Sequence, residues 1–220
     1  MRNTYREINK ITEDLIRFGL SKSQNFPCVI SNSIITWSGQ TDISFSLKDI
    51  DYNIIYKAID DGNNYNIKML DGALIQMMYT FNRDNLVSHR LAFFPSPRLE
   101  KYEDNPTAYE ELYFDEAIYH DMISKNIVPF PIRLDYNNCE EMHVDIKHPR
   151  THLHLGQYEN CRIPVKSPIT PYAYMHFILR NFYSAAFEKY FFDYDFSSET
   201  NFEDSITCNE KKILYLGVER

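Results

Sequence analysis

The sequence predicts an α+β fold, in which an antiparallel sheet is flanked by an N-terminal helix and by a long helix near the C-terminus. Apolar residues recur at spacings of three and four in both helical segments. Short β-rich runs separated by turn residues lie between them. No helical pattern of 10–15 residues interrupts the runs from Tyr65 to Phe94, so these strands should pair antiparallel.

The first predicted helix covers residues 4–20, where Thr4 and Glu7 can form a capping box. The longest predicted helix runs from Pro171 to about Tyr190, with Thr170 as its N-cap. Two shorter helices are predicted at residues 48–60 and 114–124. The predicted strands are the β-rich runs 28–37, 43–47, 65–70, 73–81, 86–94, 129–136, 161–165 and 212–218.

The chain length favours a single domain. With 220 residues it can bury a core of its own, and we predict one domain spanning residues 1–220. Residues 98–128 are polar and acidic. We interpret them as an acidic insertion, which serves either as a lid or as a solvated connector.

Charge and cysteine usage exclude several classes of protein. The net charge is −8 and lysines and arginines do not cluster, which argues against a protein that grips nucleic acid by its backbone alone. The four cysteines form no Cys-x-x-Cys pair, so neither a zinc knuckle nor a disulfide framework is predicted. There is no apolar leader and no run of 18 apolar residues, from which we expect a cytoplasmic protein without a membrane partner.

The segment from Met142 to Leu155 contains four of the seven histidines in an alternating polar and apolar pattern. Side chains alternate between the faces of a strand, so the pattern predicts one polar and one aliphatic face. With residues 148–151 as the turn, Asp145 would lie opposite His154. The predicted hairpin therefore has a polar face made of His143, Asp145, Lys147, His152 and His154.

The first hypothesis for this face is a metal site. His152 and His154 lie two positions apart on a strand, which places their backbones about 6.5–7 Å apart on one face. Both rings can converge on one divalent ion, such as Mn, Zn or Mg. Asp145 or Glu159 would complete a set of two histidines and one carboxylate. Such a site could activate water or polarise a phosphate.

The second hypothesis is acid–base chemistry without a metal. His152 and His154 would be the central pair, and His143 would be a further general acid or base. Asp145 would orient a histidine. Arg162 is the candidate for the contact with a phosphate, with Arg150 as the alternative.

The third hypothesis gives the face no chemistry. It would be a solvated surface or a protein-binding surface, with His148 as a turn residue. Elsewhere in the chain, His89 alternates with apolar residues and is predicted to be a core histidine. His176 and Arg180 share a helix face that is either directed at the hairpin or an exposed flank.

His152-Leu153-His154 is similar to the His-hydrophobic-His motif of rolling-circle and relaxase-type single-strand endonucleases. That resemblance implies a divalent metal on an antiparallel sheet and a tyrosine nucleophile on a helix. Tyr172, Tyr174 and Tyr183 follow on the predicted helix, but no Tyr-x-x-Lys occurs there.

A longer resemblance is carried by residues 148–165, which read HPRTHLHLGQYENCRIPV, and by the continuation through residues 167–171 and 177–183. This stretch resembles a bacterial family known as domain of unknown function 2290. The resemblance implies no activity. It suggests an association with phage-defence or mobile loci.

Together these patterns favour a histidine- or metal-dependent protein that cleaves phosphodiesters in RNA or single-stranded DNA, within a defence, toxin or mobile-element system. The alternative is a non-catalytic adaptor or immunity-type subunit that binds a protein partner. Convergence of the histidines and a carboxylate in an open pocket would favour the enzyme. A hairpin face covered by a partner would favour the adaptor.

Overall fold

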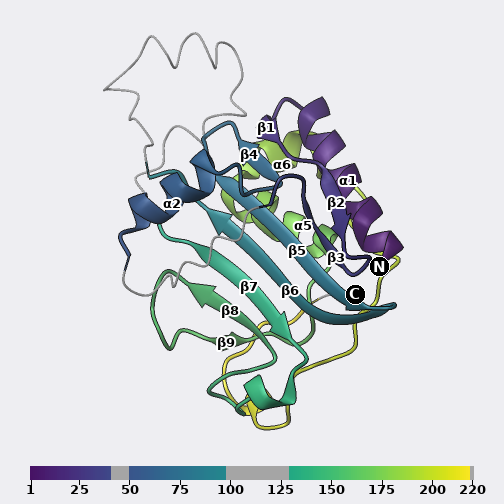
Figure 1. Ribbon diagram of the computed structural model, residues 1–220, viewed down its shortest axis with the longest axis vertical. Coiled ribbons are helices and arrows are strands. Elements are labelled where there is room, and N and C mark those ends of the chain that lie inside the picture. Colours follow the sequence, from purple (N-terminus) through teal and green to yellow (C-terminus); the bar gives the residue numbers. More distant parts are fainter. Residues whose placement is uncertain (41–49, 98–128, 219–220) are drawn as a thin grey trace.

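The computed structural model describes residues 1–40, 50–97 and 129–218 (Figure 1). Within these residues it has the predicted α+β fold, with one nine-stranded sheet whose strand pairs are all antiparallel. The predicted strand at residues 43–47, the helix at 114–124 and the acidic insertion at 98–128 lie outside the described residues. No described helix is both long and apolar enough to cross a lipid bilayer.

The sheet has the strand order β1-β4-β5-β6-β7-β8-β9, and the β2–β3 hairpin joins it through β3 and β5. Its strands are β1 (Ser21–Gln24), β2 (Pro27–Ile30), β3 (Ile34–Trp37), β4 (Ile67–Met69), β5 (Leu74–Asn82), β6 (Asn85–Phe94), β7 (Ile132–Asn137), β8 (Thr151–Leu155) and β9 (Ile163–Pro164). The described helices are α1 (Arg2–Arg17), α2 (Tyr52–Asp61), α5 (Pro171–Phe182) and α6 (Ser184–Tyr190), with short 3₁₀ turns η2 (Glu140–Met142) and η3 (Glu210–Lys212).

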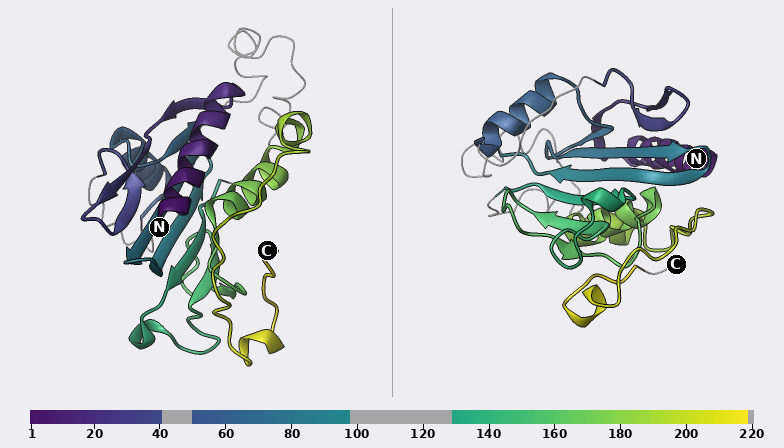
Figure 2. Two further views of the ribbon diagram at one scale, coloured as in Figure 1. Left: turned by 90° about the vertical axis from the view of Figure 1, so that its right-hand side faces the viewer. Right: turned by 60° about the horizontal axis from the view of Figure 1, so that its bottom comes forward.

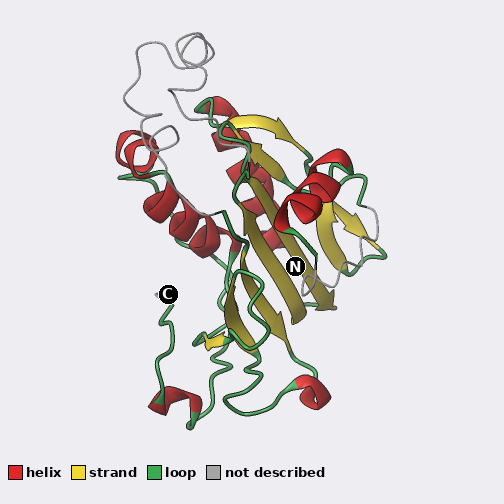
Figure 3. Ribbon diagram, turned by 90° about the vertical axis from the view of Figure 1, so that its left-hand side faces the viewer, coloured by secondary structure: helices red, strands yellow, loops and turns green. Residues whose placement is uncertain are grey.

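Helices cover the two faces of the sheet unequally. The larger core lies between the sheet and helices α1, α5 and α6, and includes Ile8, Leu91 and Ile178. A smaller core lies on the opposite face, where Ile55 of α2 packs near Phe94 of β6. Figures 2 and 3 show α2 and α5 on opposite sides of the sheet. The part of the second face formed by β7 and β8 lies away from α2 in Figure 1 and carries polar side chains.

Local signals in the sequence set the helix ends. Thr170 accepts a hydrogen bond from the Ala173 amide at 3.2 Å, and Pro171 occupies the first turn of α5, as predicted. Asp51 caps α2 through the Asn53 amide at 2.8 Å, so this helix begins later than residue 48. The long helix is broken at Tyr183 into α5 and α6, although no glycine or proline marks the position.

The predicted histidine hairpin is wrong. Strand β8 pairs with β7, and residues 138–150 form a loop with the turn η2 and a single bridge between Val144 and His148. Ile146 has a φ of +68°, which bends the chain within the segment predicted to be a straight strand. Of the expected aliphatic back, Met142, Val144 and Ile146 are exposed, whereas Leu153 of β8 is buried in the large core. β7 offers five paired positions and the large core instead.

Two further strand predictions are corrected. The run 28–37 is a hairpin, because Ser31 and Asn32 adopt positive φ angles between β2 and β3. The segment 212–218 makes only one parallel bridge, between Leu216 and Val165, in place of a full strand. The C-terminal segment nevertheless runs beside the loop at residues 138–150 near the bottom of Figure 1, where Asp145 accepts hydrogen bonds from Thr207 and Asn209.

Candidate functional site

Three ligand-type side chains meet on the second face of the sheet, where β7 and β8 pair. The register places His152 opposite Asp135 and His154 opposite Arg133. Because alternate residues share a face, Asp135, His152 and His154 all point away from the large core. One ligand atom from each lies within 4.8 Å of the other two. Two histidines and one carboxylate therefore converge.

The spacing of these atoms suits a shared ion. His154 Nε2 and Asp135 Oδ2 are 3.7 Å apart, which is too long for a hydrogen bond. Two ligands with bonds of about 2.0–2.2 Å to one ion lie roughly 3–3.5 Å apart. Asp135 Oδ1 is buried and accepts no hydrogen bond. A small contraction would place all three donors around one divalent cation.

The hydrogen bond of His152 fixes its donor atom. Its Nδ1 lies 2.6 Å from the carbonyl oxygen of Pro149. A carbonyl oxygen only accepts, so Nδ1 carries the proton. In the neutral ring Nε2 then keeps a lone pair that can bind a metal ion. Metal-binding histidines commonly donate their second ring nitrogen to a backbone carbonyl in this way.

Burial keeps both histidines in the form that can bind a metal. Desolvation, together with the charge of the nearby Arg133, lowers the pKa of His154 to about 3. Desolvation also lowers the pKa of His152, against the opposing charge of Asp135. His152 is 5% exposed and His154 is 7% exposed. Both rings are therefore neutral at pH 7, and metal binding would displace no proton from them.

Two arginines lie near the carboxylate, and a third lies near the histidines. Arg90 Nε lies 3.7 Å and Arg133 Nη1 lies 3.8 Å from the Asp135 oxygens, so neither makes a hydrogen bond to it. Arg162 is close enough to lower the pKa values of both His154 and Arg133. The Nε atoms of Arg133 and Arg162 are buried and have no hydrogen-bond partner. Three arginines and one aspartate leave an excess of two positive charges in an acidic protein.

Asp135, His152 and His154 line a cavity of about 310 Å³, to which Arg90 also contributes. Ser88 of β6 forms another part of its wall. This volume is at the lower end of the range for small-ligand sites. It can admit a phosphate group with part of the adjoining sugar.

Comparison with protein-family models identifies the chain. Residues 20–218 match the family described as "Uncharacterized conserved protein (DUF2290)". The chain belongs to this family. The family predicted from the sequence resemblance is thereby confirmed. Comparison of the DUF2290 chain with curated proteins and with solved structures found no match. Its chemistry must therefore be argued from the geometry of the site.

The site of this DUF2290 chain brings together only some of the residues predicted from sequence. His152 and His154 converge, and Arg162 lies near them. Asp145 does not join them. Glu159 is exposed and belongs to no ligand group with the two histidines among the described residues.

His143 and Asp145 belong to a second cluster with Glu210. His143 Nε2 lies 3.4 Å from Glu210, whose other oxygen accepts a hydrogen bond from the Thr207 amide. Asp145 binds the side chains of Thr207 and Asn209. The cluster ties the loop at residues 138–150 to the C-terminal segment.

Sequence reasoning missed the carboxylate of the site. Asp135 lies in the predicted strand 129–136. Leu134 separates Arg133 from Asp135 there, just as Leu153 separates His152 from His154. That shared alternation was the available signal. His148, interpreted as a turn residue, also reaches the cavity. Its ring lies 5.1 Å from that of His152, centroid to centroid.

His89 behaves as predicted. Its side chain is buried, and its Nδ1 lies 3.2 Å from the carbonyl oxygen of Leu134. Its Nε2 accepts a hydrogen bond from the Ile169 amide at 3.0 Å. Both ring nitrogens are therefore engaged, and burial lowers the pKa of the ring to about 4. His89 is a structural residue of the core next to the site.

Proposed function

We propose that this protein is a metal-dependent phosphodiesterase that acts on single-stranded nucleic acid. The observation that carries the proposal is the convergence of Asp135, His152 and His154 beneath a cluster of arginines. Two imidazoles and a carboxylate can hold Mn²⁺, Zn²⁺ or another divalent ion. Three protein ligands leave further coordination positions for water and a substrate oxygen.

The surrounding charge supports an anionic substrate. Arg133 and Arg162 have buried Nε donors without partners, and such donors are costly unless a ligand satisfies them. A phosphate supplies negative charge and several acceptor oxygens, and arginine binds it through parallel hydrogen bonds. A local positive site within an acidic chain suits one bound phosphate better than a long stretch of backbone.

Each group then has a defined role in hydrolysis. A bound divalent ion lowers the pKa of its water and polarises a phosphate oxygen. The water oxygen would form a bond to phosphorus and lose its proton to a base, while the bond from phosphorus to the leaving oxygen breaks and that oxygen takes a proton from solvent. The arginines stabilise the charge that develops on the phosphate oxygens. His148, whose Nδ1 donates to the Met142 carbonyl, presents the lone pair of its Nε2 as the group that accepts the proton of the attacking water.

The depth of the site supports a single-stranded substrate. Both histidines are almost fully buried, so a phosphate must enter the cavity to reach them. A flexible single strand can bend into such a cavity, whereas the regular backbone of a duplex holds its phosphates at the surface of the helix. RNA and single-stranded DNA are both candidates. We place the activity in the cytoplasm, where it would suit a defence, toxin or mobile-element system.

The test is cleavage of fluorescent single-stranded RNA and DNA in Mn²⁺, Mg²⁺ or Zn²⁺. We expect cleavage that EDTA abolishes and that the double variant His152→Ala/His154→Ala reduces at least a thousandfold, because the ion and its activated water are lost. Arg162→Ala should reduce cleavage about a hundredfold. Arg150→Ala is the matched control, since Arg150 binds Glu140 and Asn138 outside the cluster, and should retain activity.

Two outcomes would contradict the proposal. Cleavage that persists in EDTA but requires the histidines would replace the metal with acid–base chemistry by the same residues. A protein that binds metal yet cleaves neither substrate would favour the alternative of a non-catalytic adaptor. That alternative has an observation of its own: Ile213, Leu214 and Leu216 are exposed near the C-terminus and could contact a protein partner.

A further inference from the structure

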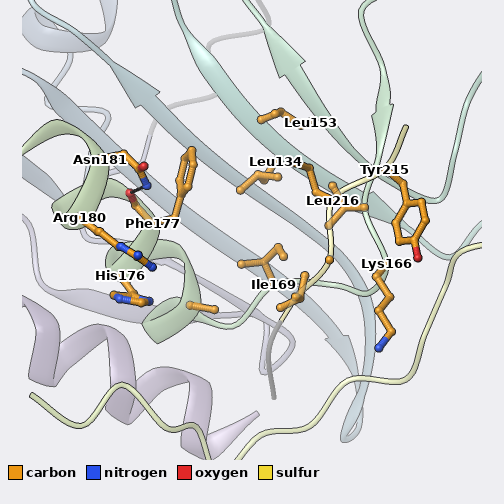
Figure 4. Close-up of a pocket in the computed structure, with 14 residues that line it drawn as sticks. Leu134, Leu153, Lys166, Ile169, His176, Phe177, Arg180, Asn181, Tyr215 and Leu216 are labelled. Atoms are coloured by element: carbon orange, nitrogen blue, oxygen red, sulfur yellow. Dashed lines mark hydrogen bonds between the residues drawn. The ribbon is translucent and has the colours of Figure 1, made fainter. Parts of the chain in front are cut away.

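A second and larger cavity lies on the opposite face of the same strands. Its volume is about 690 Å³, and it is bounded by the sheet, helix α5 and the C-terminal segment (Figure 4). Leu134 and Leu153 form its sheet wall. Each of these leucines lies between two residues of the candidate site in the sequence, so the alternation of the strand separates the two cavities.

The lining of this cavity is mostly apolar. Ile169 and Phe177 add to the leucines of the sheet, and Leu216 closes the cavity from the C-terminal side. Figure 4 shows these side chains around a common space. Cavities of 300–1,000 Å³ with apolar walls and a few polar groups are typical of small-molecule sites.

The titratable side chains of Lys, Arg, His, Asp and Glu type that line this cavity are all basic. Lys166, His176 and Arg180 line it, whereas no aspartate or glutamate does so among the described residues. The lining therefore combines an apolar body with a basic edge.

Arg180 is the group best placed to recognise a ligand. It lies on α5, and in Figure 4 it sits beside His176 and Phe177 at the helical side of the cavity. Within the described part of the chain, Arg180 takes part in no ion pair or hydrogen bond, whereas Lys166 lies 3.9 Å from Asp204. A guanidinium beside an apolar wall favours a carboxylate attached to an apolar chain.

We propose that this cavity binds a small amphipathic anion, such as a medium-chain carboxylate. Its head group would pair with Arg180, and its chain would lie along Phe177, Leu134 and Leu153. The basic edge selects the charge of the ligand, and the volume limits it to a small molecule. This site is independent of the proposed phosphodiesterase site, because no residue lines both cavities.

The test is calorimetric titration of the full chain with decanoate. Acetate is the control for the head group alone, and decyltrimethylammonium is the control for the opposite charge. We expect one molecule of decanoate to bind, with at least tenfold weaker binding of the cation and no detectable binding of acetate. Arg180→Ala should weaken decanoate binding about tenfold, since it removes one charge-assisted hydrogen bond.

Two variants keep the test decisive. Arg180 is exposed, so its removal should not affect folding, and Arg2→Ala removes another exposed arginine that does not line the cavity. Ala173→Phe extends a lining side chain of α5 into the cavity and should block binding. Normal thermal unfolding of each variant shows that the fold is retained.

Several results would overturn the proposal. Absence of decanoate binding, equal binding of the cation, or binding that survives both Arg180→Ala and Ala173→Phe would each exclude this site as an anion site. Sedimentation provides a further check. A dimer that Ala173→Phe dissociates would show that a second copy of the chain covers the cavity, in place of a small ligand.

Discussion

Replacing Asp135 by asparagine separates the observed site from the predicted hairpin. The sequence pattern predicts Asp145 or Glu159 as the carboxylate ligand, whereas the structure places Asp135 beside the two histidines. Asparagine keeps the size of the side chain and one oxygen but removes the charge. Asp135→Asn should therefore weaken metal binding strongly. Asp145→Asn is the matched control, because it removes the same charge from the cluster at the C-terminal segment.

The expected magnitude follows from the charge removed. The centre of a ligating carboxylate lies about 3 Å from a divalent ion, so their attraction is about 2.8 kcal/mol even with the dielectric constant of bulk water. This corresponds to roughly a hundredfold in Kd. It is a lower bound, because the site is buried and screening is weaker there. Loss of Asp135 would also leave Arg90 and Arg133 uncompensated beside the ion.

Titration calorimetry with Mn²⁺ and Zn²⁺, supported by elemental analysis of the purified protein, measures this effect. Wild type should bind one ion, Asp135→Asn should bind it at least a hundredfold more weakly, and Asp145→Asn should remain within twofold of wild type. Weaker metal binding by Asp145→Asn than by Asp135→Asn would instead assign the carboxylate ligand to Asp145. Equal and unchanged affinity in both would place the ion elsewhere in the chain and refute the assignment of Asp135.

Three further predictions concern stability, each measured by urea unfolding. His89 has a pKa of about 4 in the folded chain, against about 6.5 when unfolded. The unfolded state therefore binds more protons between these values, and stability should fall below pH 6.5, by about 2 kcal/mol at pH 5; an unchanged pH slope in His89→Gln would contradict this. Gly72→Ala and Gly39→Ala share the penalty of a positive φ, but a Cβ at Gly72 would lie 3.2 Å from a neighbouring side chain and one at Gly39 meets nothing within 4 Å. Gly72→Ala should therefore be more destabilising by about 1–3 kcal/mol, and equal losses would refute the role of crowding. Ile178→Ala should cost about 2–5 kcal/mol, whereas Ile54→Ala, at a side chain that is 58% exposed, should change stability by less than about 0.5 kcal/mol.

The sequence predicts the elements of this fold where local chemistry decides them. Thr170 and Pro171 start the long helix as expected, and the Asp71-Gly72 turn connects β4 to β5. Such signals act within a few residues, so one sequence suffices to read them. The break at Tyr183 was not predicted, because its cause is tertiary. The buried hydroxyl of this tyrosine donates to the Asp71 carboxylate, which lies far away in the sequence.

The error in the candidate site has a different origin. Alternation along a strand fixes which side chains share a face, and this was read correctly for His152 and His154. It does not choose the partner strand. The observed pairing with β7 puts apolar side chains on one face, as the predicted pairing with residues 142–147 would. It also places Leu134 against Leu153 in the large core. Burial of that pair favours β7, whereas the aliphatic residues of the predicted strand remain exposed.

The same alternation separates the two cavities. Leu134 lies between Arg133 and Asp135, Leu153 lies between His152 and His154, and both leucines line the opposite cavity. The backbone that carries the histidines is held by strands on both sides of β8. The core packing of Leu153 therefore sets the position of the rings on either side of it. A sheet that is buried on one face and polar on the other provides a rigid support for ligand side chains. An isolated hairpin with an exposed back would not supply that support.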